Sequence, residues 1–465
     1  MTALALNERT IRELGDSLRG ELVTPLDRGY DTTRHVWNGM IEKRPAVIAR
    51  CAGVADVVSA VKFARAFDVP ISVRGGGHSI GGSGIRDAAL TIDVRAMKGI
   101  RVDPRARSVR AQGGVLLGEF DRETTAFGLT TTLGIASTTG VAGLTLGGGL
   151  GYLMGKHGLA CDNLISVDVV LADGRFVTAS DAENSELFWA LRGGGGNFGI
   201  ATCLEFRLHP LEPIIGGVAV YPASRAKDFL RFYRDFTSSA PDNLTAYAGI
   251  GIGPPGTPVE GQQVAVAVVC HSGAQAEGER LVQPLKTFGP PVLDAIGPIP
   301  YCTLQSMFDA AFTPGNRAYW RSYFMPELSD GAIDTIVAFT ARGVPGIPGS
   351  AVFLEHMHGA LRRVGQNESA FANRSAAYSF GIFPAWADAK EDEQHIRWTR
   401  GFGDAIRPFS TGAGYVNYMT EDEGEQRVKA AYAGNYERLA AVKTRYDPTN
   451  FFRMNQNIRP DGGTV

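Results

Sequence analysis

Three glycine clusters, at residues 74–84, 138–151 and 193–199, constrain the fold of this chain more than any other feature. The first, RGGGHSIGGSG, directly follows a short β-rich segment, PISVR. Glycine adopts positive φ and lets another group approach the backbone closely, and the amides of such a loop can converge on a diphosphate. One cluster alone is compatible with an ordinary turn. Three clusters within 126 residues predict loops that face one dinucleotide.

The pattern inside the clusters narrows the choice of dinucleotide. None of them contains G-x-x-x-x-G-K-[ST], the loop that holds nucleotide phosphates with a lysine and a hydroxyl. The Rossmann pattern, G-x-G-x-x-G opening a helix with an acidic residue about 20 positions later, is also missing. FAD is therefore favoured over ATP and NAD.

Length and charge set the class of protein. A chain of 465 residues is too long for one ordinary core, so two domains are expected. Lys plus Arg number 46 against 48 for Asp plus Glu, and this balance gives no long-range field that would attract a polyanion. We expect a small-molecule substrate as partner, and neither nucleic acid nor membrane. The oligomeric state, monomer or homodimer, stays open.

Cysteine usage and the N-terminal segment bear on the compartment. The five cysteines include no C-x-x-C pair, and their odd number argues against a fully paired disulfide framework. Residues 1–20 have scattered charges and no uninterrupted apolar stretch, which is typical of an amphipathic helix. No segment approaches the roughly 20 apolar residues that span a bilayer. We therefore expect a cytoplasmic protein.

The first 210 residues alternate helices and strands around the clusters. Residues 54–67 place Val54, Val57, Val58 and Val61 at helical spacing, and Asp173-Gly174 lies between two β-rich runs as in a hairpin. Residues 116–128 are a further expected helix. From Ile200 to Leu208 every second residue is apolar or Thr, which predicts one buried face of an antiparallel strand.

From residue 211 onwards the sequence has no glycine clusters, and its pattern changes to alternating strands and helices. β-rich runs at 216–221, 244–252, 262–270, 318–324, 350–358 and 376–383 are separated by helical patterns near 224–238 and from 275. This predicts an antiparallel sheet backed by helices. The tail predicts a helix ended by Asp447-Pro448, followed by an extended segment that packs back on the first domain.

Six motifs together resemble one family. RGGGHSIGG, AQGG, TTGVAGLTLGGGLG, KHGLACDNL, WALRGGGGNFGI and YDPTNFFRMNQNI, in this order, resemble the berberine-bridge-enzyme-like FAD-linked oxidases of the vanillyl-alcohol-oxidase superfamily, and most closely the bacterial oxidases that tailor natural products. The match spans roughly 40–210 and 411–460. It implies an α+β fold with a PCMH-type FAD-binding domain, from 1–210 plus 411–465, and an inserted substrate domain at 211–410.

His78 is the residue most sharply singled out. From the residues alone, a histidine after three glycines could bind a phosphate or cap the loop, or it could be attached to the cofactor. The resemblance implies covalent attachment to the flavin 8α-methyl group. Family members with a second link carry a cysteine where this chain has Ala136, so one link is implied. The other expected FAD contacts are Arg74, Gly75, Gly76, Gly77, Ser79, Gly82, Gln112, Gly114, Thr138, Thr139, Gly140, Gly143, Leu144, Gly147, Asn163, Gly199, Ile200, Asn417 and Asn455.

The catalytic candidates are Tyr418, Glu355 and Tyr415. Oxidation of carbon by a flavin needs a base for the proton of the adjoining hydroxyl or similar group. YVNY, residues 415–418, resembles the family motif whose second tyrosine is that base, and Glu355 could assist Tyr418 or act as base itself. The alternatives to these catalytic roles are that Tyr418 is a packed strand tyrosine and that Glu355 is a solvated residue of a strand. Tyr415 and Asn417 are also candidates for flavin or substrate contacts.

Three functions follow from these residues. The leading one is an FAD oxidase of secondary metabolism that oxidises an alcohol, amine or polyketide-like intermediate and is reoxidised by molecular oxygen. The others are a flavin dehydrogenase with another acceptor and a catalytically silent flavin-binding protein. No metal is expected, because His356 and His358 alternate on one strand without a third ligand nearby.

Overall fold

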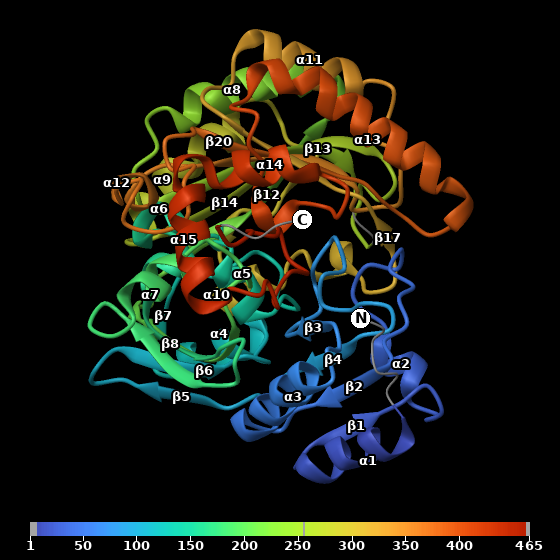
Figure 1. Cartoon of the computed structure of the whole chain (residues 1–465). Coiled ribbons are helices and arrows are strands. Elements are labelled where there is room, and N and C mark those ends of the chain that lie inside the picture. The colour runs from blue at the N-terminus through green and yellow to red at the C-terminus, as the bar shows by residue number, and fades with distance from the viewer. Residues whose placement is uncertain (1–6, 254–255, 462–465) are drawn as a thin grey trace.

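The computed structural model describes residues 7–253 and 256–461, and its chain forms two layers of sheet and helix above one another (Figure 1). The lower layer holds two small sheets built from the first 210 residues. The upper layer is one large sheet with helices on its outer side. The segment GPPGTPVEG at 253–261, whose glycines and prolines favour a loop, lies partly outside the described residues. Among the described helices, none combines the length and apolarity needed to cross a bilayer.

The first small sheet carries the first glycine cluster. Its strands, in spatial order, are β1 (Glu21–Val23), β2 (Val47–Arg50), β4 (Leu90–Asp93) and β3 (Ile71–Arg74). β2, β4 and β3 run parallel, and β1 is antiparallel to β2. Helices α1 (Glu8–Ser17) and α3 (Val54–Ala66) pack together beside it, and α2 (Tyr30–Arg34) lies near its edge. The helix predicted at 54–67 is thus confirmed, and the cluster begins where β3 ends.

The second small sheet is antiparallel throughout. Its order is β5 (Ile100–Asp103), β6 (Ser108–Gln112), β10 (Ile200–Arg207), β8 (Leu164–Val170) and β9 (Phe176–Ser180). Val170 pairs with Phe176 around Gly174, whose φ is +81°, so the predicted hairpin is confirmed. The predicted inward face of β10, from Ile200 to Phe206, is buried, while Arg207 is exposed. The pair β7 (Leu129–Thr130) and β11 (His209–Pro210) lies beside this sheet.

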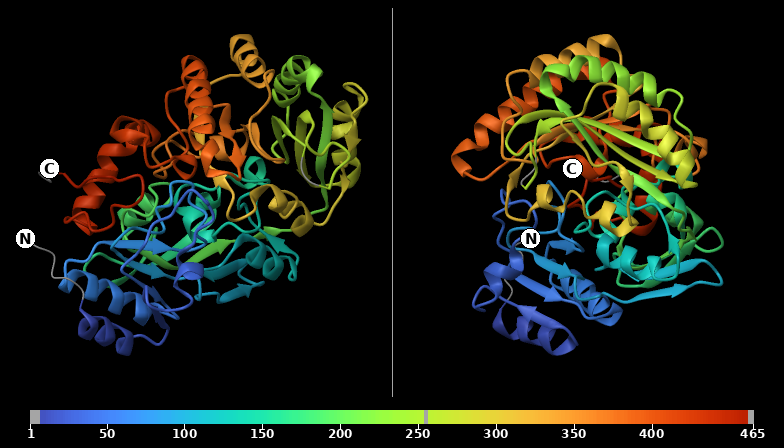
Figure 2. Two further views of the ribbon diagram at one scale, coloured as in Figure 1. Left: turned by 90° about the vertical axis from the view of Figure 1, so that its right-hand side faces the viewer. Right: turned by 180° about the vertical axis from the view of Figure 1, so that it is seen from behind.

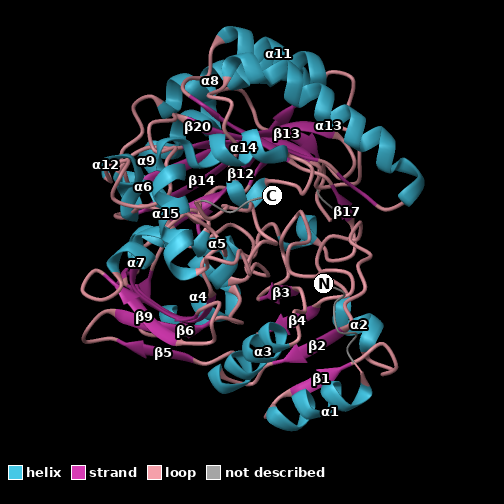
Figure 3. Ribbon diagram, viewed as in Figure 1, coloured by secondary structure: helices cyan, strands magenta, loops and turns pink. Residues whose placement is uncertain are grey.

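Short helices connect these strands. They are α4 (Leu117–Thr125), α5 (Val141–Leu146), α6 (Met154–His157) and α7 (Ser185–Leu191). The glycines of the second cluster predict a loop, and the structure forms α5 there instead (Figure 3). The reason is that five of the six residues between Gly140 and Gly147 carry side chains, which is enough for a short helix between glycine ends.

The large sheet confirms the antiparallel sheet backed by helices. Its order is β15 (Leu293–Asp294), β12 (Ile214–Pro222), β14 (Gln263–Ser272), β13 (Leu244–Ile252), β19 (Ala351–His356), β20 (Tyr378–Phe383) and β18 (Arg321–Met325), and β16 (Gly297–Pro298) also pairs with β12. Its helices are α8 (Ala226–Thr237), α9 (Gln275–Thr287), α11 (Asp330–Thr340) and α13 (Asp392–Ile406). They arch over the outer face (Figure 2), where Phe229, Leu354 and Phe380 share a core.

The strand expected at 318–324 is wrong in its extent. Residues 317–318 form β17 (Arg317–Ala318), which pairs with β21 (Ala385–Trp386), and β18 starts only at Arg321. Tyr319 and Trp320 belong to neither strand, because the chain passes there from one sheet to the other. The Trp320 side chain is therefore not held in the pleat of a sheet.

The C-terminal segment returns to the lower layer. Helix α14 (Gly424–Tyr432) precedes α15 (Tyr436–Tyr446), which packs against α7. Helix α10 (Tyr301–Gln305) contacts α4, and α12 (Ala360–Arg363) contacts α6. The inner face of the large sheet therefore meets the glycine clusters and the chain end in one region.

Candidate active site

One cavity of about 270 Å³ lies where the glycine clusters, the large sheet and the C-terminal segment meet. Its wall contains most of the residues predicted from sequence. They are Arg74, Gly75, Gly76, Gly77, His78, Ser79, Thr139, Gly140, Gly143, Leu144, Gly199, Ile200, Tyr415, Asn417, Tyr418 and Asn455. Residues from both ends of the chain thus form a single wall.

The first two glycine clusters touch each other through their backbones. A Cβ atom on Gly76 would lie 2.5 Å from the amide nitrogen of Gly140, and a Cβ on Gly140 would lie equally close to that of Gly76. Backbone atoms cannot move aside as a flexible side chain can. This glycine-lined cradle fits a diphosphate, because it brings main-chain N–H groups to the cavity without side chains in the way.

His78 lies in the cavity wall beside Trp37. Their rings stack with centroids 4.6 Å apart, and Thr138 Oγ1 is 3.5 Å from His78 Nε2. Burial lowers the pKa of His78 to about 4, so the imidazole is neutral at pH 7. A neutral imidazole keeps a lone pair on one ring nitrogen, which is the form needed for bonding to carbon.

The YVNY segment is tied to the second glycine cluster. Tyr415 Oη accepts hydrogen bonds from the Gly149 amide at 2.8 Å and from Asn417 Nδ2 at 2.7 Å. Asn417 also donates to the Leu144 carbonyl at 2.9 Å. Burial raises the pKa of Tyr415. These contacts give Tyr415 a positioning role, and they fix the 3₁₀ turn that carries Tyr418.

Tyr418 and Glu355 form a polar pair at the cavity. Tyr418 belongs to the wall, and its Oη donates to Glu355 Oε1 at 3.1 Å. Glu355 is 4% exposed, and burial raises its pKa to about 7. Its Oε2 atom has no hydrogen-bond partner among the described residues. Burial and the Glu355 charge keep the pKa of Tyr418 well above its usual value. Tyr418 belongs to the cavity lining and Glu355 does not, so in this structure the pair meets the cavity through Tyr418.

Six predicted cofactor contacts lie outside the cavity lining: Gly82, Gln112, Gly114, Thr138, Gly147 and Asn163. Gly147 faces Asn417, since a Cβ atom there would lie 2.1 Å from its side-chain oxygen. Gln112 accepts from the Gly99 amide at 2.8 Å, and Asn163 donates to the carbonyls of His157 and Leu159. The contacts of Gln112 and Asn163 therefore stabilise neighbouring backbone, whereas Thr138 contacts His78.

The sequence does not predict the aromatic residues of the cavity wall. Phe312, Trp320 and Phe383 line the cavity, and Trp37 packs behind His78. Phe383 and Trp320 contact the Tyr418 ring, with centroids 5.0 and 5.8 Å apart. The aromatic run AYWRSYF is the available signal, but its β-rich composition predicts only a strand.

The two histidines after Glu355 stack on each other with centroids 4.4 Å apart. His358 Nε2 lies 3.2 Å from the Pro241 carbonyl, and burial lowers the pKa of His356 to about 3. Within the described ranges, no group of three or more His, Cys, Asp or Glu side chains is placed to hold a metal ion.

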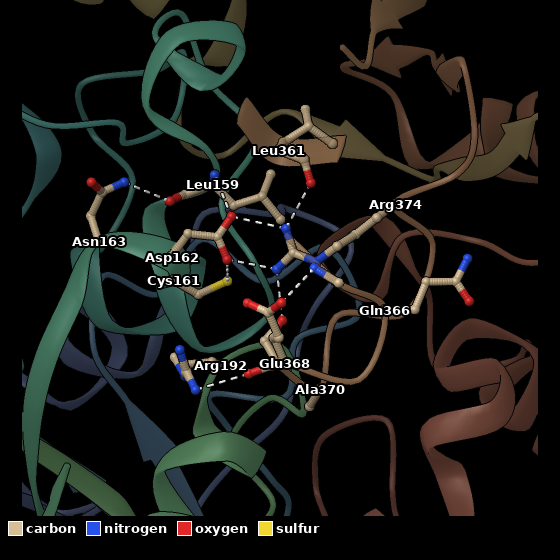
Figure 4. Close-up of polar contacts among 12 residues, drawn as sticks. Leu159, Cys161, Asp162, Asn163, Arg192, Leu361, Gln366, Glu368, Ala370 and Arg374 are labelled. Atoms are coloured by element: carbon tan, nitrogen blue, oxygen red, sulfur yellow. Dashed lines mark hydrogen bonds and ion pairs between the residues drawn. The ribbon is translucent and has the colours of Figure 1, made fainter. Parts of the chain in front are cut away.

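A buried ion pair between Asp162 and Arg374 lies next to the second glycine cluster (Figure 4). Arg374 donates from Nη1 to Asp162 Oδ2 at 2.9 Å and from Nη2 to Asp162 Oδ1 at 2.6 Å, and it also binds Leu361 and Ser369. The amides next to Asp162, those of Ala160 and Cys161, donate to Gly149 and Gly148. The pair therefore joins the loop around 366–374 to the glycine cluster that Tyr415 contacts.

Comparison with known proteins gives two matching families. Residues 45–180 match the FAD binding domain family, and residues 414–459 match the family described as berberine and berberine like. An FAD-linked oxidoreductase of Dictyostelium discoideum is 32% identical, over 91% of each chain. The (R)-6-hydroxynicotine oxidase of Paenarthrobacter nicotinovorans is 31% identical, over 96% of this chain and 98% of its own.

Solved structures agree with the fold. The crystal structure of 6-hydroxy-D-nicotine oxidase from Arthrobacter nicotinovorans superposes with a TM-score of 0.86 at 29% identity, covering 96% of this chain and 99% of its own. Glucooligosaccharide oxidase from Acremonium strictum, whose FAD is 6-S-cysteinyl and 8α-N1-histidyl, gives 0.87 at 26% identity, covering 97% and 99%.

Proposed function

The chain belongs to the berberine-bridge-enzyme-like family of FAD-linked oxidoreductases, and we propose that it is an oxidase that takes a hydride from a small organic substrate and returns the electrons to oxygen. The observation that carries this proposal is the Tyr418–Glu355 pair at a glycine-lined cavity. Relatives named as oxidases, for 6-hydroxynicotine and for glucooligosaccharide, support it. Secondary metabolism is the setting we propose.

FAD is the cofactor, and its contacts are proposed from the cavity wall. When bound, it supplies an electrophilic ring that accepts two electrons as a hydride. The amides around Gly76 and Gly140 are suited to the diphosphate. His78, neutral and held by Trp37, is suited to a single covalent link, and Ala136 in the wall has no thiol for a second one.

The protein's own part of the oxidation is removal of a proton. When a hydride leaves carbon, the hydroxyl or amino group on that carbon must lose its proton. Tyr418 can take this proton while Glu355 accepts the tyrosine hydrogen, or Glu355 can take it directly. Water is kept from this step because Glu355 is buried and aromatic rings pack around Tyr418.

Peroxide formation tests the oxidase function. Compounds that bleach the yellow protein without oxygen identify substrates, and air should then restore the colour with one hydrogen peroxide per substrate oxidised. Reoxidation only by an added dye, without peroxide, would instead indicate a dehydrogenase. A flavin that no compound in a broad panel bleaches would indicate a catalytically silent protein.

Covalent attachment gives a separate prediction. Acid-precipitated wild-type protein should stay yellow, whereas His78→Ala should release its FAD into the supernatant, because the imidazole is the proposed bonding group. Flavin absorbance of pellet and supernatant measures this. His35→Ala, which alters an exposed histidine outside the cavity lining, is the matched control and should stay yellow. A yellow His78→Ala pellet would assign the link to another residue.

A further inference from the structure

The inner face of the large sheet carries two phenylalanine side chains near Glu355. In a strand, residues two apart share a face, as do partners in register on neighbouring strands. Phe353 and Glu355 therefore share the inner face of β19. Glu355 pairs with Ser379 and Ala351 with Phe383, so Phe383 of β20 lies on this face too.

Glycines make room for the two phenylalanine rings. Phe353 pairs in register with Gly249 on one side and with Gly381 on the other. A Cβ atom on Gly381 would lie 2.0 Å from the Phe383 ring, and one on Gly249 would lie 3.1 Å from the Phe353 ring. Each ring thus lies down across a position without a side chain, as glycine in a strand allows. The two rings form an apolar floor on this face of the sheet, and Phe383 is the one that lines the cavity.

Trp320 packs against this apolar floor and lines the cavity beside it. Its ring contacts Phe383 with centroids 4.8 Å apart and Tyr418 at 5.8 Å, in an edge-on orientation to Tyr418. Phe312 contacts Trp320 from the far side, at 6.2 Å. Any group that meets the Tyr418 hydroxyl therefore enters among aromatic rings.

Among the described residues no cation pairs with Glu355, whose hydrogen-bond partner is Tyr418. The only charged residues of the described lining are Arg74 and Arg453. Arg74 donates to the backbone carbonyls of Thr33 and His35, and Arg453 is exposed. An anionic group beside Glu355 would therefore meet a buried carboxylate with no cation paired to it, and a buried charge without a partner is costly. A sugar would likewise leave most of its hydroxyls without partners against these rings.

We infer that the substrate is a planar aromatic molecule, neutral or cationic, whose oxidised carbon carries a hydroxyl or amino group directed at Tyr418 and Glu355. This substrate class rests on the proposed oxidase function. In the oxidation the C–H and X–H bonds break and a C=X bond forms, where X is oxygen or nitrogen. The hydrogen of C–H leaves with two electrons to FAD, and the X–H proton goes to the Tyr418–Glu355 pair.

Binding of matched probes tests the inference without turnover. The probes are 2-naphthalenemethanol, its decahydro counterpart, 2-naphthoate and cellobiose, and the readout is the change in the flavin absorbance spectrum on titration. Because a saturated ring cannot stack on the aromatic rings of the cavity wall, 2-naphthalenemethanol should bind at least about tenfold more tightly than its decahydro counterpart. Naphthoate and cellobiose should bind more weakly still. Equal affinity for the first two probes, or strongest binding of either of the others, would overturn the inference.

Variants assign the effect to the aromatic floor. Phe383→Leu should reduce the aromatic preference to below about threefold, because the variant has one aromatic ring fewer to stack on the probe. Phe127→Leu, which alters an exposed phenylalanine away from the cavity, should keep it. An unchanged preference in Phe383→Leu would contradict the assignment. Tight binding of 2-naphthalenemethanol by a protein that no compound reduces would support the substrate class while refuting the oxidase function.

Discussion

Tyr418→Phe is expected to slow anaerobic flavin reduction by roughly 10² to 10⁴, the usual worth of general-base catalysis, while flavin content and reoxidation by air stay as in the wild type. The substitution removes only the hydroxyl that donates to Glu355, and it keeps the ring against Trp320 and Phe383. Stopped-flow absorbance with a substrate identified by bleaching measures the rate.

Glu355→Gln separates the two possible bases. If Glu355 only polarises Tyr418, this substitution should slow reduction less than Tyr418→Phe does; if Glu355 takes the proton directly, the slowing should be equal or greater. Burial raises the pKa of Glu355 to about 7, and the step needs the ionised carboxylate. The wild-type rate should therefore rise as pH increases through about 7 and level off above it, and Glu355→Gln should abolish this rise.

Tyr30→Phe is the matched control for the tyrosine. Its hydroxyl is also buried, donating to the Pro45 carbonyl at 2.7 Å, but it lies outside the cavity lining. Reduction should proceed at the wild-type rate. If both Tyr418→Phe and Glu355→Gln also kept that rate, neither residue would be the base, and Tyr415, His356 and His358 would be the next candidates.

Arg374→Met should destabilise the protein by about 3–5 kcal/mol, because it leaves the Asp162 carboxylate buried without its partner. Both side chains of the pair are buried, with Arg374 1% and Asp162 7% exposed, so bulk water does not solvate either charge in the folded protein. The midpoint of urea-induced unfolding, followed by far-UV circular dichroism, reports the change. Adding Asp162→Asn to Arg374→Met should recover part of the stability, since the uncompensated charge is then gone.

A surface ion pair provides the comparison. Arg407 and Asp404 lie 2.9 Å apart, but both side chains are more than half exposed. Arg407→Met should therefore change stability by less than about 1 kcal/mol. If Arg374→Met had an equally small effect, the buried pair would contribute little to joining the loop at 366–374 to the glycine cluster.

The sequence predicted best what is encoded locally. Glycine spacing, the Asp173-Gly174 hairpin and the alternation from Ile200 to Phe206 each depend on neighbouring residues, and the structure confirms the last two. The family resemblance implies catalytic roles for Tyr418 and Glu355, and the structure brings these two within hydrogen-bonding distance.

What the sequence could not predict depends on register between distant strands. Phe383 reaches the site because β20 pairs with β19 in one particular alignment, and a shift by one residue would turn it to the helix side. Trp320 reaches it because the chain leaves one sheet before joining another. Asp162 and Arg374 are 212 positions apart, so nothing in their local patterns links them.

The cavity wall combines residues that the ribosome makes early with residues that it makes late. His78 and the first glycine cluster emerge early, but Tyr415, Asn417, Tyr418 and residues up to Gln456 complete the wall. Tyr415 also holds the second cluster through the Gly149 amide. A nascent chain therefore has no finished cofactor site until nearly all 465 residues have been released. We therefore expect flavin loading, and the proposed bond to His78, to follow release of the chain up to Gln456 from the ribosome.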